Sequence, residues 1–273
     1  MISRRSLLAL AGAAPLLRAG RKRYPVGLEM YSVRTEMEKD LEGAIRKVAG
    51  MGFEDVEFYS PYYSWTSAMT KDIRKLLDDL NVTCRSTHND GTSFRPDGIQ
   101  KAIDLNGILG SRYVVLASAG KIEDLDGWKR AAEMLSTAAD RFAAANLRAG
   151  CHNDSTEFTP IDGQIPMNVV AANTPASVML QLDVGHCVAS GGDPVAFIKA
   201  HPGRINSLHL KDWSPEKKFE ALLGEGVVPW KKVFEASEKS GGVEFYLIEH
   251  EGHVSAPFEA ARQCLASYRK IHG

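Results

Sequence analysis

Eight short apolar segments alternate with amphipathic helical patterns along almost the whole chain. Each apolar segment is rich in aliphatic or β-branched residues and is bounded by turn residues, which is typical of buried strands. The predicted strands span residues 26–30, 55–58, 82–88, 113–118, 147–153, 178–184, 205–211 and 245–250. The helical patterns between them run roughly over residues 38–50, 70–80, 97–109, 127–146, 166–173, 194–200, 229–240 and 257–271.

This alternation predicts parallel strands that are joined by right-handed crossover helices. Eight such units favour a single closed (β/α)8 TIM barrel over an open doubly wound sheet, since a barrel of this kind needs about 250 residues. No GxGxxG motif opens the first helix, which argues further against a dinucleotide-binding fold. The hydrophobic share of 44% is enough for one large core. We therefore expect one α/β barrel domain over residues 24–273.

The first twenty residues, MISRRSLLALAGAAPLLRAG, have the pattern of an export signal. Arg4 and Arg5 form a basic start, an apolar run extends from Leu7 to Leu17, and small residues follow near Ala19. This order predicts a cleavable twin-arginine-type signal peptide over residues 1–20. The apolar run is too short to span a bilayer. We expect a periplasmic or otherwise exported protein without membrane contact after cleavage; the alternative is an amphipathic N-terminal helix of a cytoplasmic protein.

The net charge of the chain argues against nucleic acid as a partner. Cleavage near Ala19 removes three arginines and no acidic residue, which takes the formal net charge from -1 to -4.

The chain has four cysteines, and three of them lie in or beside predicted strands, where a small buried residue is expected. We therefore expect no structural disulfide among Cys84, Cys151, Cys187 and Cys264.

Polar residues gather at the C-terminal ends of the predicted strands. In parallel barrels, these ends and the loops that follow them build the active site. The residues at these positions are Glu29, Tyr31, Glu57, His88, His152, Glu157, Asp183, His186, His209, Lys211, Glu249 and Glu251. Chance scattering would place as many ionisable residues at the strand starts, so the pattern predicts a polar site at one rim of the barrel.

In the stretch LQLDVGH, Asp183 stands at the end of a predicted buried strand, where a carboxylate needs a partner. The carboxylates of Asp183 and Glu249 and the imidazoles of His152 and His209 would together form a cage of nitrogen and oxygen ligands. Such a cage suits Mn, Co, Zn, Ni or Fe, and Mg less well. His209 and Lys211 share one face of their strand, so both would point into the mouth of the barrel.

Several motifs carry a resemblance to a known family. They are GLEMYSVR, VEFYSPYY, STH, CHNDSTEF, LDVGH, GGDP, LHLKD, GEGVVPW and IEHEG. From residue 27 to the C-terminal helix, the chain resembles the xylose isomerase-like TIM barrel superfamily, in its sugar phosphate isomerase/epimerase branch. The resemblance implies a metal at the ends of strands five to eight and maps onto Asp183, His209 and Glu249. On strand five, sugar epimerases of this fold place a glutamate that serves as ligand and base; this chain has His152 there, and Glu157 is the other candidate.

The leading expectation is a metal-dependent sugar isomerase or epimerase. The metal would polarise a carbonyl, and a base would remove the neighbouring proton. The candidate catalytic residues are Glu249, Glu157, Glu57 and Lys211. The candidate substrate contacts are His88, His186, Tyr31, Tyr63 and Trp65, since aromatic rings beside a barrel mouth suit stacking on a sugar. Because phosphorylated sugars are scarce outside the cytoplasm, we expect an unphosphorylated carbohydrate.

Two alternatives use the same residues. A keto-sugar lyase or hydratase, or a hydrolase, would use the same metal site for a reaction other than isomerisation. His152 in place of a second glutamate favours the lyase. A non-catalytic sugar-binding protein would keep the barrel without the chemistry. A nuclease of this fold is opposed by the acidic net charge. The sequence names neither the sugar nor the metal, and it leaves a homo-oligomer open.

Overall fold

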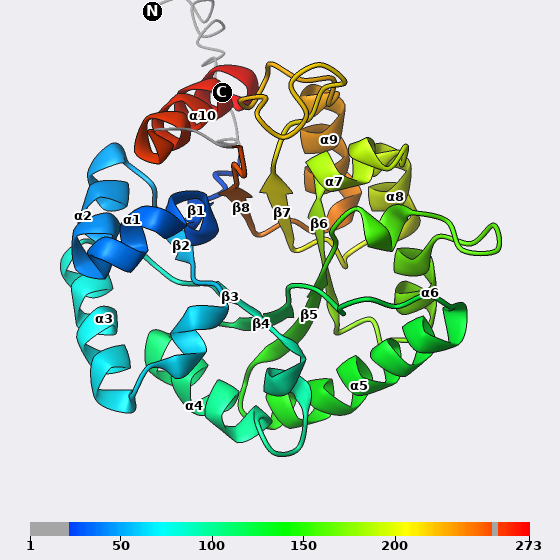
Figure 1. Cartoon of the computed structure of the whole chain (residues 1–273), viewed down its shortest axis with the longest axis horizontal. Helices are drawn as coiled ribbons and strands as arrows, with labels where there is room; N and C mark the ends of the chain where they lie inside the picture. Colours follow the sequence, from blue (N-terminus) through cyan, green and yellow to red (C-terminus); the bar gives the residue numbers. More distant parts are fainter. Residues whose placement is uncertain (1–21, 253–255) are drawn as a thin grey trace, which may run out of the picture.

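The computed structural model describes residues 22–252 and 256–273, and it contains eight parallel strands. They are β1 (Val26–Glu29), β2 (Asp55–Glu57), β3 (Ser86–Asn89), β4 (Tyr113–Leu116), β5 (Arg148–His152), β6 (Met179–Asp183), β7 (Ser207–Leu210) and β8 (Phe245–Ile248). The strands follow the order β2-β1-β8-β7-β6-β5-β4-β3, so neighbours in sequence are neighbours in space. Figure 1 shows them as the inner ring of the molecule.

The ring is nearly closed. Between β2 and β3 the contact consists of two isolated parallel bridges, Asp55 with Thr83 and Phe58 with Thr87. The predicted (β/α)8 barrel is therefore confirmed. The strand predicted from residue 82 begins only at Ser86, because Asp55 Oδ1 accepts hydrogen bonds from Thr83 Oγ1 (2.6 Å) and from the Arg85 amide (3.1 Å) in the segment before it.

Helices form an outer ring around the strands (Figure 1). They are α1 (Arg34–Lys39), α2 (Leu41–Met51), α3 (Ser67–Asp79), α4 (Ile99–Leu109), α5 (Leu125–Ala144), α6 (Pro166–Ala172), α7 (Val184–Ala189), α8 (Pro194–Ala200), α9 (Trp230–Ala236) and α10 (Pro257–His272). The helix predicted from residue 38 begins at Leu41, because the Asp40 side chain caps it by accepting from the Gly43 amide at 2.9 Å. The short helix α7 was not predicted from the sequence.

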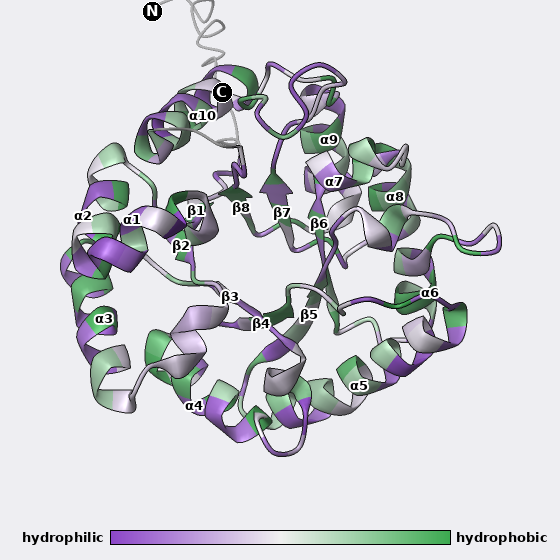
Figure 2. Cartoon of the chain, viewed as in Figure 1, coloured by the Kyte–Doolittle hydropathy of each residue, from purple (hydrophilic) through white to green (hydrophobic). Residues whose placement is uncertain are grey.

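The strand faces that point into the barrel change from apolar to polar along β6 and β8. A buried cluster separate from the main core fills the lower part, with Tyr113, Val115, Met179, Phe245 and Leu247 as its members. Because side chains alternate along a strand, Gln181 and Asp183 lie on the same face as Met179, and Glu249 continues the face of Leu247. Hydrophilic residues lie at the tip of β7 (Figure 2). The apolar cluster is therefore the floor beneath the polar strand ends.

The described residues bear on two further predictions. Their four cysteines are buried and free. None of the described helices combines the length and the apolar composition needed to cross a bilayer. The predicted signal peptide over residues 1–20 lies outside the described residues.

Candidate metal centre at the barrel mouth

The ends of four consecutive strands bring together His152, Asp183, His209 and Glu249. One ligand atom of each lies within 4.8 Å of the others, and all four residues are buried. His152 Nε2 lies 3.8 Å from Asp183 Oδ2, and His209 Nδ1 lies 4.0 Å from the same oxygen. His209 Nδ1 also lies 2.6 Å from Glu249 Oε2. The fold thus places the four predicted ligands around a common point.

The donor atoms of this cluster fit a divalent ion. His152 Nε2 and Asp183 Oδ2 are buried without a hydrogen-bond partner, an arrangement that is costly unless another group satisfies them. His152 Nδ1 faces the Ala117 carbonyl oxygen at 3.0 Å. Because a carbonyl only accepts, Nδ1 carries a proton, and in the neutral ring the lone pair is on Nε2. A buried set of two imidazoles and two carboxylates could therefore hold a metal.

A second hydrogen bond fixes the orientation of His209. Its Nε2 donates to Glu57 Oε2 at 2.7 Å, and its Nδ1, which faces the cluster, donates to Glu249 Oε2 at 2.6 Å. Burial disfavours the charge of the ring, but Glu249 and Glu57 outweigh it and raise the pKa of His209 well above its usual range, so a metal ion would replace the Nδ1 proton. The other oxygen, Glu57 Oε1, accepts from Gln181 Nε2 at 3.0 Å. Gln181 Oε1 in turn accepts from His88 Nε2 at 2.7 Å. Glu57, Gln181 and His88 thus form a polar layer that fixes the ring of a candidate ligand.

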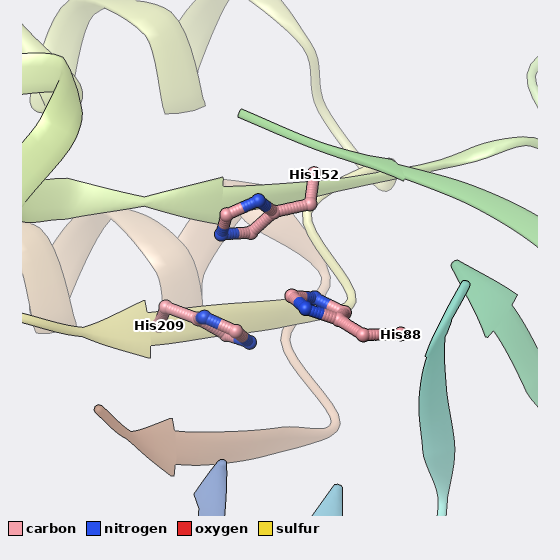
Figure 3. Close-up of side chains that lie close together, drawn as sticks. All are labelled: His88, His152 and His209. Atoms are coloured by element: carbon pink, nitrogen blue, oxygen red, sulfur yellow. The ribbon is translucent and has the colours of Figure 1, made fainter. Parts of the chain in front are cut away.

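Three imidazole rings meet at this layer, as Figure 3 shows for His88, His152 and His209. The rings of His88 and His209 are stacked at 4.8 Å with an interplanar angle of 22°. Burial lowers the pKa of His88 to about 4, so its ring is neutral. Burial opposes the ionisation of Glu57, but His88 and His209 outweigh it and lower the pKa of Glu57 to about 2.

Carboxylate oxygens surround the ammonium of Lys211. Its Nζ lies 3.0 Å from Asp183 Oδ2 and 3.2 Å from Glu249 Oε2. It lies 2.8 Å from Glu251 Oε1. These contacts form a buried ion cluster. Burial disfavours the charge, but the three carboxylates outweigh it and raise the pKa of Lys211 well above its usual range.

His186 lies at the rim of the site, one turn into α7. The Asp183 side chain caps α7 by accepting from the His186 amide at 2.8 Å. His186 Nδ1 lies 2.9 Å from Ser155 Oγ, and its Nε2 lies 3.5 Å from Glu251 Oε2 and 3.7 Å from Asp154 Oδ1. His186 Nε2 is buried without a hydrogen-bond partner. The same helix start therefore positions both the candidate ligand and the rim imidazole.

Glu157 is buried, but it lies outside the groups of candidate ligands found among the described residues. Its Oε2 accepts from the Asp154 amide at 2.8 Å and from Thr156 Oγ1 at 2.9 Å, which holds the loop after β5. Its Oε1 is buried without a partner. Burial raises the pKa of Glu157. The structure therefore brings His152, rather than Glu157, to the four-residue cluster.

The predicted aromatic contacts lie apart from the cluster. Trp65 packs in the core against Phe58, with ring centroids 5.1 Å apart, and Tyr63 donates its hydroxyl to the Gly98 carbonyl at 2.8 Å. Tyr31 is 37% exposed, and its ring meets that of Tyr59 edge to face at 5.3 Å. Of the predicted stacking residues, Tyr31 is exposed, Tyr63 is partly buried and Trp65 is buried.

Gln181 was not singled out from the sequence, and Glu29 and Glu251 were placed at the rim of the barrel without a specific role. Gln181 links Glu57 to His88, and Glu251 contacts Lys211. Glu29 is fully buried with Oε2 unpartnered, and burial, followed by Glu57 and Glu249, raises its pKa well above its usual range. The signal for Gln181 was its two-residue spacing from Asp183, which puts both on the same face of β6.

The chain belongs to the xylose isomerase-like TIM barrel family, whose model matches residues 45–271. Among curated relatives, it is 25% identical over 155 residues to an inosose dehydratase of Lacticaseibacillus casei, covering 50% of this chain and 52% of the relative. The chain thus spans about half the length of the curated relatives that it matches.

Two solved structures share the fold. A sugar phosphate isomerase/epimerase from Parabacteroides distasonis ATCC 8503 has a TM-score of 0.76 and 24% identity, covering 93% of this chain and 96% of that one. D-Psicose 3-epimerase from Clostridium cellulolyticum H10 has a TM-score of 0.68 and 17% identity, covering 90% and 98%. At these sequence identities, the structural similarity shows that the chain has the barrel fold. The reaction has to be argued from the residues of the site.

Proposed function

We propose that this protein is a metal-dependent enzyme that removes water from a neutral keto-sugar or keto-polyol. The observation that carries the proposal is the buried cluster of His152, Asp183, His209 and Glu249, in which His152 Nε2 has no hydrogen-bond partner. A divalent ion in this cluster would supply a Lewis acid that polarises the substrate carbonyl. The mixed nitrogen and oxygen donors suit Mn, Co, Zn, Ni or Fe.

Two side chains beside the cluster have geometry suited to the substrate. The Lys211 ammonium, next to Asp183 and Glu249, would bind a substrate oxygen. The Nε2 atom of His186 would move the proton, since it lies at the rim with no hydrogen bond to hold it, 3.5 Å from Glu251 Oε2. Dehydration removes a proton from the carbon beside the carbonyl and a hydroxyl from the next carbon, and a double bond forms between them. One imidazole can accept that proton and return it to the departing hydroxyl, which leaves as water.

The carboxylates of the site favour dehydration over a two-base epimerisation. Inversion at carbon requires one base on each face of the substrate. Both oxygens of Glu57 are engaged, by His209 and by Gln181. Oε2 of Glu157 is engaged by the loop after β5. The inosose dehydratase relative supports the same reading, as does His152 at the strand-five position.

Sugar isomerisation or epimerisation on an unphosphorylated substrate is the second candidate. The observation that favours it is Glu157 Oε1, which is buried without a partner and would serve as a base after a shift of its loop. The structural likeness to a sugar phosphate isomerase/epimerase and to D-psicose 3-epimerase supports this candidate.

Incubation of the Mn²⁺-loaded protein with inososes and ketohexoses in deuterated water separates these reactions. Products that have lost one water, identified by mass spectrometry, support dehydration. Isomers of the substrate skeleton that carry solvent deuterium support the second candidate. Isomers formed without solvent deuterium would refute proton abstraction for the second candidate, and binding without turnover favours a sugar-binding protein. Asp183→Asn is the matched control, because it removes a ligand while keeping the size of the side chain.

We also propose that the protein is exported through its N-terminal segment. The support is the sequence pattern of residues 1–20, with Arg4 and Arg5 ahead of an apolar run. Replacing both arginines by lysine should leave the uncleaved chain in the cytoplasm of a host that has the twin-arginine route. Equal export of the wild-type chain and the variant would contradict this proposal.

A further inference from the structure

The Lys211 ammonium contacts the same two oxygen atoms that face the imidazoles of the candidate metal centre. Asp183 Oδ2 lies 3.0 Å from Lys211 Nζ and 3.8 Å from His152 Nε2. Glu249 Oε2 lies 3.2 Å from Lys211 Nζ and 2.6 Å from His209 Nδ1. A divalent ion in the cluster and the ammonium would therefore share both carboxylates.

Two cations that share ligands in a buried site repel each other strongly, because the surroundings screen them poorly. The base of Lys211 has little freedom to avoid this conflict. A methyl group on Gly185 would lie 2.7 Å from the Lys211 carbonyl oxygen and 3.0 Å from its Cγ, which shows how closely the backbone of α7 packs against it. Only the end of the side chain can move away from Asp183 and Glu249.

Glu251 is placed to receive the ammonium when it moves. Its Oε1 lies 2.8 Å from Lys211 Nζ, the shortest of the three carboxylate contacts of that atom. Its side chain is 27% exposed, whereas that of Asp183 is fully buried. The charges also balance in pairs: the ion with Asp183 and Glu249, and Lys211 with Glu251.

We propose that Glu251 is a positioning residue that holds Lys211 away from the ligand oxygens and so sets the affinity of the centre for a divalent ion. The inference rests on the proposed metal site. Without Glu251, the ammonium has Asp183 and Glu249 as its remaining anionic partners and competes with the ion for them. The effect of Glu251 on metal affinity must then pass through Lys211.

The test is calorimetric titration of the metal-free full chain with Mn²⁺, using wild type, Glu251→Gln, Lys211→Met and the double variant. Glu251→Gln should weaken Mn²⁺ binding at least tenfold in the wild-type background and less than threefold in the Lys211→Met background. Lys211→Met alone should bind Mn²⁺ at least as tightly as wild type. Glu225→Gln is the control: Glu225 also pairs with a lysine at 2.8 Å, Lys217, but on the exposed surface, and its removal should change affinity less than twofold.

An equal loss from Glu251→Gln in both backgrounds would overturn the inference, because it would show a direct charge effect that does not involve Lys211. No loss from Glu251→Gln would overturn it as well. A wild-type chain that binds no divalent ion would refute the metal site itself, and the inference with it. If Lys211→Met does not give the thermal unfolding transition of a folded protein, Lys211→Gln takes its place in the cycle.

Discussion

Glu57→Gln tests whether the layer beneath the cluster controls the metal ligand above it. In the wild-type chain, Glu57 accepts from His209 Nε2 at 2.7 Å and from Gln181 Nε2 at 3.0 Å. A glutamine has one oxygen for these two donors. If its amide nitrogen faces His209, Nε2 must accept and give up its proton, so the remaining proton of the ring stays on Nδ1, the atom that faces Asp183 and Glu249, and Nδ1 has no lone pair to offer a metal.

If the amide oxygen faces His209 instead, the mismatch between donors and acceptors moves to the contact between Gln181 and His88. Gln181 must then turn its own amide, and its nitrogen meets His88 Nε2, which donates in the wild-type chain. Either arrangement leaves a buried donor unpaired or moves a tautomer, at a cost of about 1–3 kcal/mol. Loss of the partner that orients a metal-binding histidine typically lowers metal affinity about 10–100-fold, or about 1.4–2.7 kcal/mol.

The double variant Glu57→Gln/Gln181→Glu should recover the affinity. Its glutamine oxygen accepts from His209, its glutamine nitrogen donates to the new carboxylate, and that carboxylate accepts from His88. Calorimetric titration with Mn²⁺ measures both variants. Glu54→Gln is the control, because Glu54 pairs with Arg23 at the surface. A folded Glu57→Gln chain that binds Mn²⁺ within threefold of wild type would refute the reasoning.

Three further predictions concern ligands and stability. Asp183→Asn should reduce Mn²⁺ affinity more than any variant of the layer below, since it removes a ligand charge; calorimetry checks this, and wild-type affinity would contradict it. Tyr62→Phe should destabilise the fold by about 1–3 kcal/mol, because the hydroxyl bonds Asn89 Oδ1 and accepts from Asn106 Nδ2 at 2.9 Å; at about 2–4 °C per kcal/mol, a melting curve resolves the change. Burial raises the pKa of Asp55 from 3.8 to about 8, so its neutral form stabilises the fold at low pH and this stability is lost as pH rises through 8. Asp55→Asn should therefore gain stability relative to wild type at pH 9 compared with pH 5, and equal differences in melting temperature at both pH values would contradict this.

The fold was predictable because its evidence is local. A short apolar run indicates each strand, and the spacing of apolar residues along the sequence indicates each helix. The order of the elements can therefore be predicted without long-range information. The misplaced start of β3 has a tertiary cause, because Asp55 on β2 takes hydrogen bonds from Thr83 and Arg85. Helix α7 has a local cap, but the cap is Asp183, whose position at a strand end suggested a ligand rather than a helix start.

The proximity of the four candidate ligands follows from the topology of the barrel. The hydrogen-bond partners of these ligands do not follow from it. Parallel strands bring their C-terminal ends to one rim, so Asp183, His209 and Glu249 had to lie near one another. The bond between Glu57 and His209 crosses the barrel, and it depends on strand tilt and stagger that the sequence pattern does not give. The sequence also does not reveal that Trp65 turns into the core rather than toward the mouth, because an aromatic residue in a loop satisfies either environment.

The charges of the mouth argue for an uncharged substrate. Each cation of the described site already faces carboxylates: Lys211 faces Asp183, Glu249 and Glu251, and His209 lies between Glu57 and Glu249. A phosphate group at this position would meet more negative than positive charge, and its hydration would be lost without a matching ion pair. A free ketose or inosose should therefore raise the melting temperature of the Mn²⁺-loaded protein more than the phosphate ester of the same skeleton at equal concentration. A larger stabilisation by the ester would show that a cation beyond these two serves the substrate, and the proposal of an unphosphorylated substrate would fail.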